Sequence, residues 1–171
     1  MQAGMSIDII IEHAPWEGVD IESLAEAAER ATLERLGLEP SIFETALLAC
    51  DDARIAALNG DFRDRPQPTN VLSWPSEERG AQVEGEMPHL PRFGGGPPEE
   101  LGDIALAWET CARESEEAGR PVEAHVTHLI VHGLLHLLGF DHVRDGDAAL
   151  MEGLETEILA KMGVPDPYGG A

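Results

Sequence analysis

The sequence predicts an α/β fold in which a small mixed sheet of about four strands is covered by helices, all within one domain spanning residues 1–171. The first observation is that short apolar runs alternate along the chain with longer segments of helical period. The second is the length of 171 residues, which is that of one ordinary domain. The third is the segment His125 to Leu138, which is apolar on nearly every side and predicts a buried central helix.

The individual elements follow from local sequence signals. Short apolar runs predict strands over Ser6 to Ile11, Glu44 to Ala49, Asn70 to Trp74 and Asp103 to Trp108. Helical segments are predicted over Ile21 to Leu36, from Asp51 or Asp52 through Asn59, and over Glu109 to Ala118, His125 to Leu138 and Ala148 to Met162. Glycines that predict helix ends follow four of them, at Gly37, Gly119, Gly139 and Gly163.

The segment from Pro75 to Leu101 is rich in Gly, Pro and Glu and shows no sustained period. We therefore expect a flexible loop at about residues 76–101 within the domain. Because it offers few apolar side chains to bury, replacing Glu78 to Pro98 with a short Gly/Ser linker is expected to change thermal stability little.

Composition restricts the possible partners and location. The formal net charge of −22 argues against non-specific nucleic-acid binding, because polyphosphates are attracted mainly by Lys and Arg. Ten of the 11 basic residues are arginines, and a few well-placed ones can hold phosphate through bidentate contacts. No apolar run approaches the ~20 residues that span a bilayer, and the first residues lack a secretory signal pattern, so we expect a cytoplasmic protein. Cys50 and Cys111 are expected to be reduced core thiols.

The chemistry-bearing stretch is HGLLHLLGFDH, residues 132–142. His132 and His136 are four apart, so on a helix their side chains stack on one face and can reach one ion. Gly139 can end the helix in the left-handed conformation and let the chain bring His142 to a third position. Neutral, unpartnered imidazoles would be costly on so apolar a helix, which favours a role for them. Three nitrogen ligands plus water describe an open, catalytic site for one Zn²⁺ per chain.

The other histidines carry weaker signals. His125 and His128 lie on the same side of this helix, one or two turns earlier, and we expect them to be packed or hydrogen-bonded, while roles in supporting the metal ligands or in contacting RNA stay open. The zinc pattern matches HExxHxxGxxH of metzincin peptidases, except that Gly133 replaces the glutamate that acts as general base. This departure counts against proteolysis.

The same stretch resembles the HGxLHLxGYDH signature of the YbeY family of bacterial endoribonucleases. Further segments agree with that family in the same order: LNGDFRDRPQPTNVLSWP (58–75), LGDIALA (101–107) and MEGLETEILAKMGVPDPY (151–168). The resemblance covers nearly the whole domain. Asn70 and Phe140 depart from the common Asp and Tyr, and the segment from Pro75 to Leu101 is longer than a minimal member needs.

The resemblance implies a small α/β sandwich with zinc at the end of a cleft, held by His132, His136 and His142. It implies metal-dependent cleavage of single-stranded RNA in small-subunit ribosomal RNA maturation and ribosome quality control, with the small ribosomal subunit or an assembly factor as partner. Arg63 corresponds to the family's functionally important arginine. We expect Arg63 and His136 to take part in catalysis, and Arg63 with Arg65 to bind the substrate.

Arg54 is a further candidate for tracking the RNA backbone, whereas Arg79 and Arg92, in the long loop, are expected to matter much less than Arg63. Two other hypotheses stay open. One is a zinc-dependent hydrolase of another substrate, including a degenerate peptidase. The other is a ribosome-assembly factor whose zinc is chiefly structural, in which case removing the metal would unfold the domain.

Overall fold

A computed structural model describes residues 7–63, 67–91 and 98–168, with side chains up to residue 60 in the first range. The strands are β1 (Ile7–Ile11), β2 (Phe43–Cys50), β3 (Val71–Pro75) and β4 (Glu99–Ala107). The helices are α1 (Ile21–Arg35), α2 (Asp52–Arg63), α3 (Trp108–Ala118), α4 (Val122–Leu137) and α5 (Asp145–Lys161), with short 3-10 turns at Ala14–Val19 and Pro40–Ile42. The predicted fold class is confirmed, and most predicted boundaries hold within a few residues.

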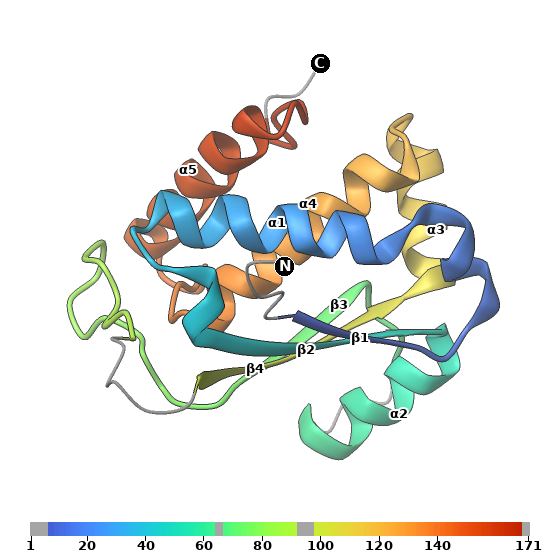
Figure 1. The fold of residues 1–171 in the computed structure, drawn as a ribbon, viewed down its shortest axis with the longest axis horizontal. Coiled ribbons are helices and arrows are strands. Elements are labelled where there is room, and N and C mark those ends of the chain that lie inside the picture. The colour runs from blue at the N-terminus through green and yellow to red at the C-terminus, as the bar shows by residue number, and fades with distance from the viewer. Residues whose placement is uncertain (1–6, 64–66, 92–97, 169–171) are drawn as a thin grey trace.

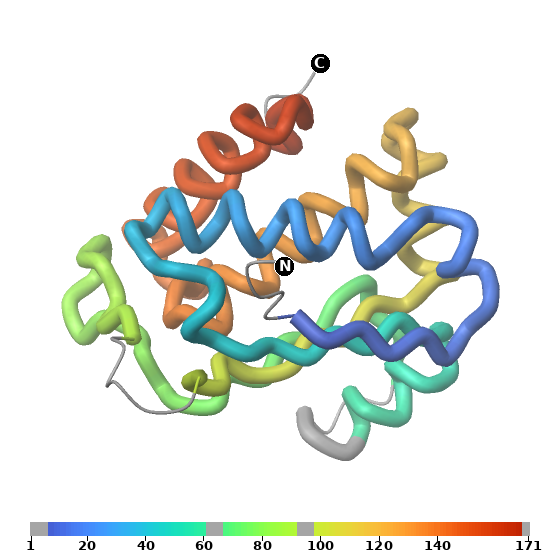
Figure 2. Tube along the Cα trace, viewed as in Figure 1, coloured from blue at the N-terminus to red at the C-terminus, as the bar shows by residue number. Residues whose placement is uncertain are grey.

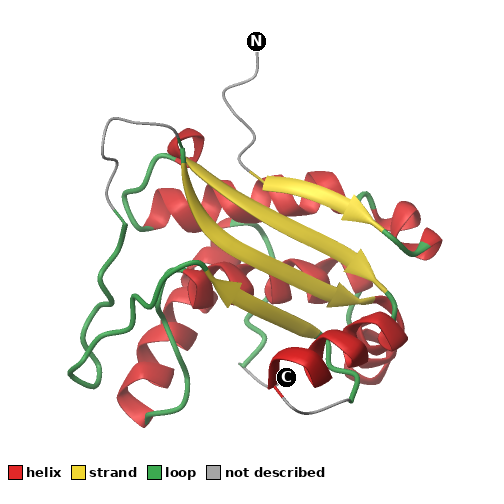
Figure 3. Ribbon diagram, turned by 90° about the horizontal axis from the view of Figure 1, so that it is seen from below, coloured by secondary structure: helices red, strands yellow, loops and turns green. Residues whose placement is uncertain are grey.

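The four strands form one mixed sheet in the order β1-β2-β4-β3. β1, β2 and β4 run parallel, whereas β3 pairs antiparallel with β4 and lies at the edge. Figure 3 shows the edge strand β3 pointing opposite to the parallel strands. α1 lies between the parallel strands β1 and β2, which is the helical crossover that such a pair requires, whereas β4 follows its antiparallel neighbour β3 along the chain.

Helices cover the two faces of the sheet unequally. α1, α4 and α5 lie on one face, and α2 lies on the other (Figure 1). The larger core cluster fills the first face and includes Leu47, Ile104, Ile130 and Leu134, which are at most 1% exposed. A smaller cluster around Ile55 lies under α2. Because successive side chains of β4 point to opposite faces of the sheet, this strand contributes residues to both clusters.

α4 is the central helix that the sequence predicts. It packs against α1, α3, α5 and the sheet, and nine of its residues are buried. Among the described residues, no helix is both long and apolar enough to reach across a bilayer. Cys50 and Cys111 are free and buried in the core, as expected, and burial raises the pKa of the Cys50 thiol to about 12.

Between β3 and β4 the structure differs from the prediction in two respects, the start of β4 and the packing of the preceding segment. β4 begins at Glu99, four residues before the predicted start at Asp103, because Glu99 and Glu100 pair with Phe43 and Glu44. Residues 76–91 have no regular secondary structure, as expected, but they pack against the end of α4 and the start of α5 (Figure 2).

Arg79 anchors this segment. Its side chain is only 3% exposed, and its guanidinium donates to the carbonyl of Leu137, the last residue of α4, at 2.9 Å. It also donates to Ser76 and pairs with Glu99 at 3.3 Å. The last carbonyls of a helix lack hydrogen-bond donors within the helix and attract positive charge. The guanidinium of Arg79 provides both a donor and a positive charge. The expectation of a segment with little to bury is therefore wrong at Arg79, and deleting Glu78 to Pro98 would remove this anchor.

We predict that Arg79→Ala lowers the free energy of unfolding by about 2 to 3 kcal/mol, because it leaves the Leu137 carbonyl without its charged donor. Urea titration measures this. Arg54→Ala is the matched control, because Arg54 is half exposed and pairs with Glu12 at 3.3 Å, an exposed ion pair worth at most about 1 kcal/mol. Equal stability of the two variants would contradict the anchoring role.

Candidate metal centre

α4 presents two of the predicted ligands on one face. His132 and His136 lie one turn apart, with ring centroids 4.6 Å from each other. Both are half-buried, whereas neighbours such as Val131, Leu134 and Leu135 are fully buried. Burial of the apolar stripe therefore fixes the rotation of α4 and turns the two imidazoles toward the edge of the core.

The third predicted ligand arrives through the turn that ends α4. Gly139 has a φ of 106°, and its N–H donates to the carbonyl of His136 while the N–H of Phe140 donates to that of Leu135, both at 3.0 Å. This is the Schellman pattern, which glycine at this position favours. The reversal brings the ring of His142 to 5.3 Å from that of His132 and 5.0 Å from that of His136.

One ligand atom from each of these three histidines lies within 4.8 Å of the other two, an arrangement that can hold a metal ion. The predicted convergence of the three rings is confirmed. Burial, helped by the neighbouring His132 and His142, lowers the pKa of His136 to about 4. His136 is therefore neutral near pH 7, the form in which imidazole binds a metal.

Glu155, a residue that the sequence motifs did not single out, lies beside His132. It belongs to α5 and is completely buried. Its carboxylate contacts Nδ1 of His132 at 3.2 Å and Nε2 of His128 at 2.6 Å. Burial opposes its ionisation, but the hydrogen bonds with His128 and His132 outweigh burial and lower the pKa of Glu155 to about 2. Glu155 is therefore a buried anion beside the proposed metal ligands.

A signal for Glu155 is present in the sequence. The buried positions of α5 are Met151, Leu154, Glu155, Ile158 and Leu159. They follow the 3-and-4 spacing of an apolar helix stripe, and Glu155 is its one charged member. A carboxylate inside such a stripe requires partners, and its presence there marks a functional or networked residue.

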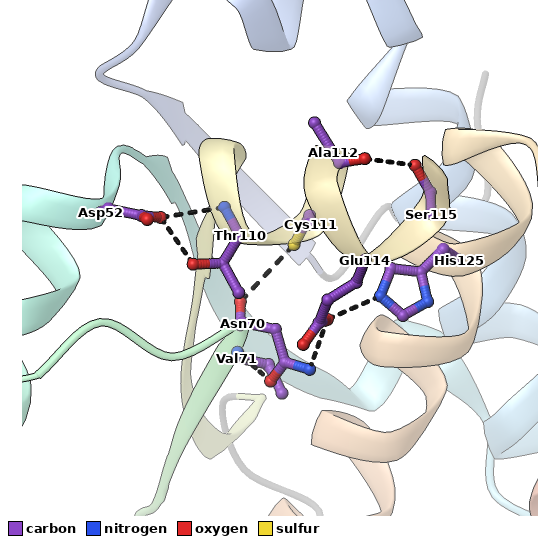
Figure 4. A network of polar contacts seen from close by, with 9 residues as sticks. All are labelled: Asp52, Asn70, Val71, Thr110, Cys111, Ala112, Glu114, Ser115 and His125. Carbon is purple, nitrogen blue, oxygen red and sulfur yellow. Dashed lines mark hydrogen bonds and ion pairs between the residues drawn. The ribbon is translucent and has the colours of Figure 1, made fainter. Parts of the chain in front are cut away.

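The two earlier histidines of α4 are hydrogen-bonded, as predicted. His128 contacts Glu155, and His125 contacts Glu114 of α3 at 2.9 Å. Figure 4 shows that Glu114 also accepts from the amide of Asn70 at 2.9 Å, just before β3. Asn70 therefore donates where an aspartate could not, which gives this departure from the common family residue a structural role.

A cavity of about 1230 Å³ opens beside the three histidines. Its lining combines β3 and the segment 77–81 with the turn after α4. Among the residues that the structure describes, seven acidic ones line it, namely Glu77, Glu78, Glu86, Asp141, Asp147, Glu152 and Glu155.

The described basic residues of the lining are Arg79 and Arg144, and both are engaged within the protein. Arg144 binds Asp147 and the carbonyls of Ala81 and Gln82. Neither guanidinium is therefore available to hold a phosphate without breaking these bonds.

The two predicted substrate-binding arginines lie at or beyond the limit of the residues that the structure describes. Arg63 is the last residue of α2, and its side chain lies outside the described residues. Arg65 lies outside them altogether. Asn59, one turn before Arg63 on α2, lines the cavity, so the end of α2 approaches it.

Comparison with known proteins gives concordant results. The family model described as Endoribonuclease YbeY matches residues 9–163. A protein of Jannaschia sp. named Endoribonuclease YbeY is 58% identical over 164 residues, which cover 96% of this chain and all of that protein. One of the same name from Dinoroseobacter shibae is 57% identical over 97% of this chain and 92% of its own length.

The solution structure of TM1509 from Thermotoga maritima covers 92% of this chain and 91% of its own, with a TM-score of 0.54 at 18% identity. At that identity the likeness shows the shared fold alone. The family match and the close relatives both extend over nearly the whole chain, including the 132–142 motif and the strands that flank the cavity. This chain therefore belongs to the endoribonuclease YbeY family.

Proposed function

We propose that this protein is a zinc-dependent endoribonuclease that cleaves single-stranded RNA during small-subunit ribosomal RNA maturation and ribosome quality control. Membership of the endoribonuclease family supports an RNA-cleaving hydrolase with a role in ribosomal RNA processing. The observation that carries the metal part of the proposal is the convergence of three imidazoles at the wall of a large cavity.

The chemistry of the donor set fits zinc. His132, His136 and His142 offer three nitrogen atoms, and the cavity leaves a fourth direction open, which is the arrangement of a catalytic rather than a closed structural zinc site. A zinc ion bound there supplies Lewis acidity for an attack on a phosphodiester.

The protein's own residues bind the metal and hold the RNA. The three histidines hold and orient the metal, and His136, which is neutral and half-buried, is one of them. We assign Arg63 to the phosphate group and Arg65 to the adjoining RNA backbone. Guanidinium matches phosphate through bidentate hydrogen bonds, and such contacts strengthen as charge grows on the phosphate oxygens.

The packing of Gly133 argues against a peptidase. A Cβ at this position would lie 3.1 Å from Cδ1 and 3.3 Å from Cγ2 of Ile104, in the sheet core. The position that carries the general-base glutamate in metzincins is here pressed against β4, so a larger side chain would have to displace Ile104.

The acidic lining of the cavity implies that binding of RNA there needs further contacts outside the cavity. With seven carboxyl-bearing residues around the cavity, free RNA is repelled unless other groups hold it. We therefore propose that the substrate is presented on the small ribosomal subunit or by an assembly factor.

The experiment compares cleavage of end-labelled single-stranded RNA and of the same sequence in a duplex by zinc-loaded protein. His136→Ala, purified identically, guards against a contaminating nuclease. Preferential cleavage of the single strand by the wild-type protein alone supports the proposal. Equal activity in His136→Ala, or no RNA cleavage by the zinc-loaded protein, contradicts it.

Arg63 provides a prediction that separates substrate binding from metal binding. Arg63→Ala is expected to keep its zinc and its fold while RNA cleavage falls at least tenfold, up to the ~3 kcal/mol scale of one lost transition-state contact. Arg63→Lys should recover only part of the rate, because a point charge lacks bidentate geometry. Single-turnover rates measure this. A wild-type rate for Arg63→Ala would show that this arginine is only surface charge.

A further inference from the structure

The proposed ligand His132 and three side chains behind it, Glu155, His128 and Tyr168, form a continuous hydrogen-bonded group. Glu155 is its centre: Oε2 contacts His132, and Oε1 contacts His128 and accepts from the hydroxyl of Tyr168 at 2.9 Å. Tyr168 also lies 3.3 Å from Nε2 of His128. A completely buried carboxylate is costly unless such bonds satisfy it.

We propose that Glu155 is the positioning residue of the metal centre, fixing His132 in the tautomer that carries its proton on Nδ1 and turns the free Nε2 lone pair toward His136 and His142. This inference rests on the proposed metal site and names a residue that acts through one of its ligands. Carboxylate oxygens are hydrogen-bond acceptors, and Oε2 of Glu155 lies 3.2 Å from Nδ1 of His132, so the tautomer with the proton on Nδ1 satisfies this contact.

The position of Glu155 also affects the ligand's strength. A carboxylate on the far nitrogen of a ligating imidazole raises its basicity and holds the ring in place. Glu155 is itself held, because His128 and Tyr168 occupy its other oxygen. α5 thus contributes to a site whose ligands all belong to α4 and the turn after it.

The alternative is that Glu155, His128 and His132 themselves ligate a metal, since their ligand atoms also lie within 4.8 Å of one another. The distances favour hydrogen bonding. Two ligand atoms at ~2.1 Å from a tetrahedral zinc ion are about 3.4 Å apart. Nε2 of His128 and Oε1 of Glu155 are 2.6 Å apart, which is a short hydrogen-bond distance and too close for two ligands of one zinc ion.

Glu155→Gln tests the proposal with nearly constant shape. The glutamine amide can donate to Nδ1 of His132, which favours the tautomer with the proton on Nε2 and blocks that ligand. Zinc affinity, measured by competition with a chromogenic chelator, is expected to fall about 10- to 100-fold. Glu155→Asp should recover part of this loss. Glu157→Gln, on the exposed side of the same helix, removes an equal charge and should bind zinc as the wild type does.

Nitrogen chemical shifts of the metal-free protein read the tautomer directly and do not depend on activity. The expected result is His132 protonated on Nδ1 in the wild type and on Nε2 in Glu155→Gln. Tyr168→Phe, which removes one donor to Glu155, should weaken zinc binding severalfold and keeps the test valid if Glu155→Gln fails to fold.

Three outcomes overturn the proposal in distinguishable ways. Unchanged zinc affinity in folded Glu155→Gln and in Tyr168→Phe refutes the positioning role and leaves the metal site standing. Loss of a second equivalent of zinc in Glu155→Gln shows that Glu155 is itself a ligand. Absence of zinc from the wild type refutes the proposed metal centre, and the role of Glu155 with it.

Discussion

A variant with His132→Ala and His136→Ala is expected to lose its zinc and to cleave RNA at least about a hundredfold more slowly than the wild type. The two rings lie 4.6 Å apart on α4 and supply two of the three proposed ligands, so one imidazole cannot hold the ion. The rate loss is the scale of the several kcal/mol of transition-state charge stabilisation that a metal contributes. Metal analysis and single-turnover cleavage of single-stranded RNA measure the two effects.

The matched control for this variant is His89→Ala, because His89 is exposed and lies outside the group of three. It should retain about one equivalent of zinc and the wild-type rate. Retention of a full equivalent of zinc in the double variant would end the assignment of these ligands.

Gly139→Ala is expected to destabilise the protein by about 3 kcal/mol or more and to weaken metal binding. Its φ of 106° is strained for any other residue, and an added Cβ would lie 2.7 Å from the backbone carbon and oxygen of Arg79. Relief of this clash requires the turn after α4 to move away from the segment 76–91. That turn carries His142, so the third ligand would leave its position. Urea titration and zinc affinity report the two consequences.

Gly153→Ala makes the same substitution in the middle of α5, where nothing lies within 4 Å of the added Cβ. It should raise the free energy of unfolding by about 0.5 to 1 kcal/mol through helix propensity. If Gly139→Ala behaved like Gly153→Ala, the close approach of Arg79 to this turn would not constrain the structure.

The sequence predicts those parts of the molecule whose determinants are local. α4 and its ending at Gly139 follow from an apolar period and a stop signal, and the position of His142 follows from the turn that such a glycine makes. The third imidazole could therefore be assigned before any tertiary contact was known.

The parts that escaped prediction depend on contacts between distant segments. The start of β4 consists of two glutamates whose strand conformation comes from pairing with β2. Arg79 is buried because it meets the end of α4, a partner 58 residues away along the chain. Glu155 is the intermediate case, since the stripe in α5 marks it as buried but only the structure names its partners.

The proposed ligands all lie within the segment 132–142, which has a consequence in terms of chain entropy. An ion that joins them closes only a short loop, so it removes little of the unfolded chain's freedom compared with a link between distant elements. The unfolded segment also keeps the same imidazoles at a high effective concentration and binds metal itself, which reduces any net stabilisation of the folded state. The core beneath α4, with Ile130 and Leu134, is built from apolar side chains and not from the three histidines. We therefore expect a metal bound to these ligands to exchange while the fold persists.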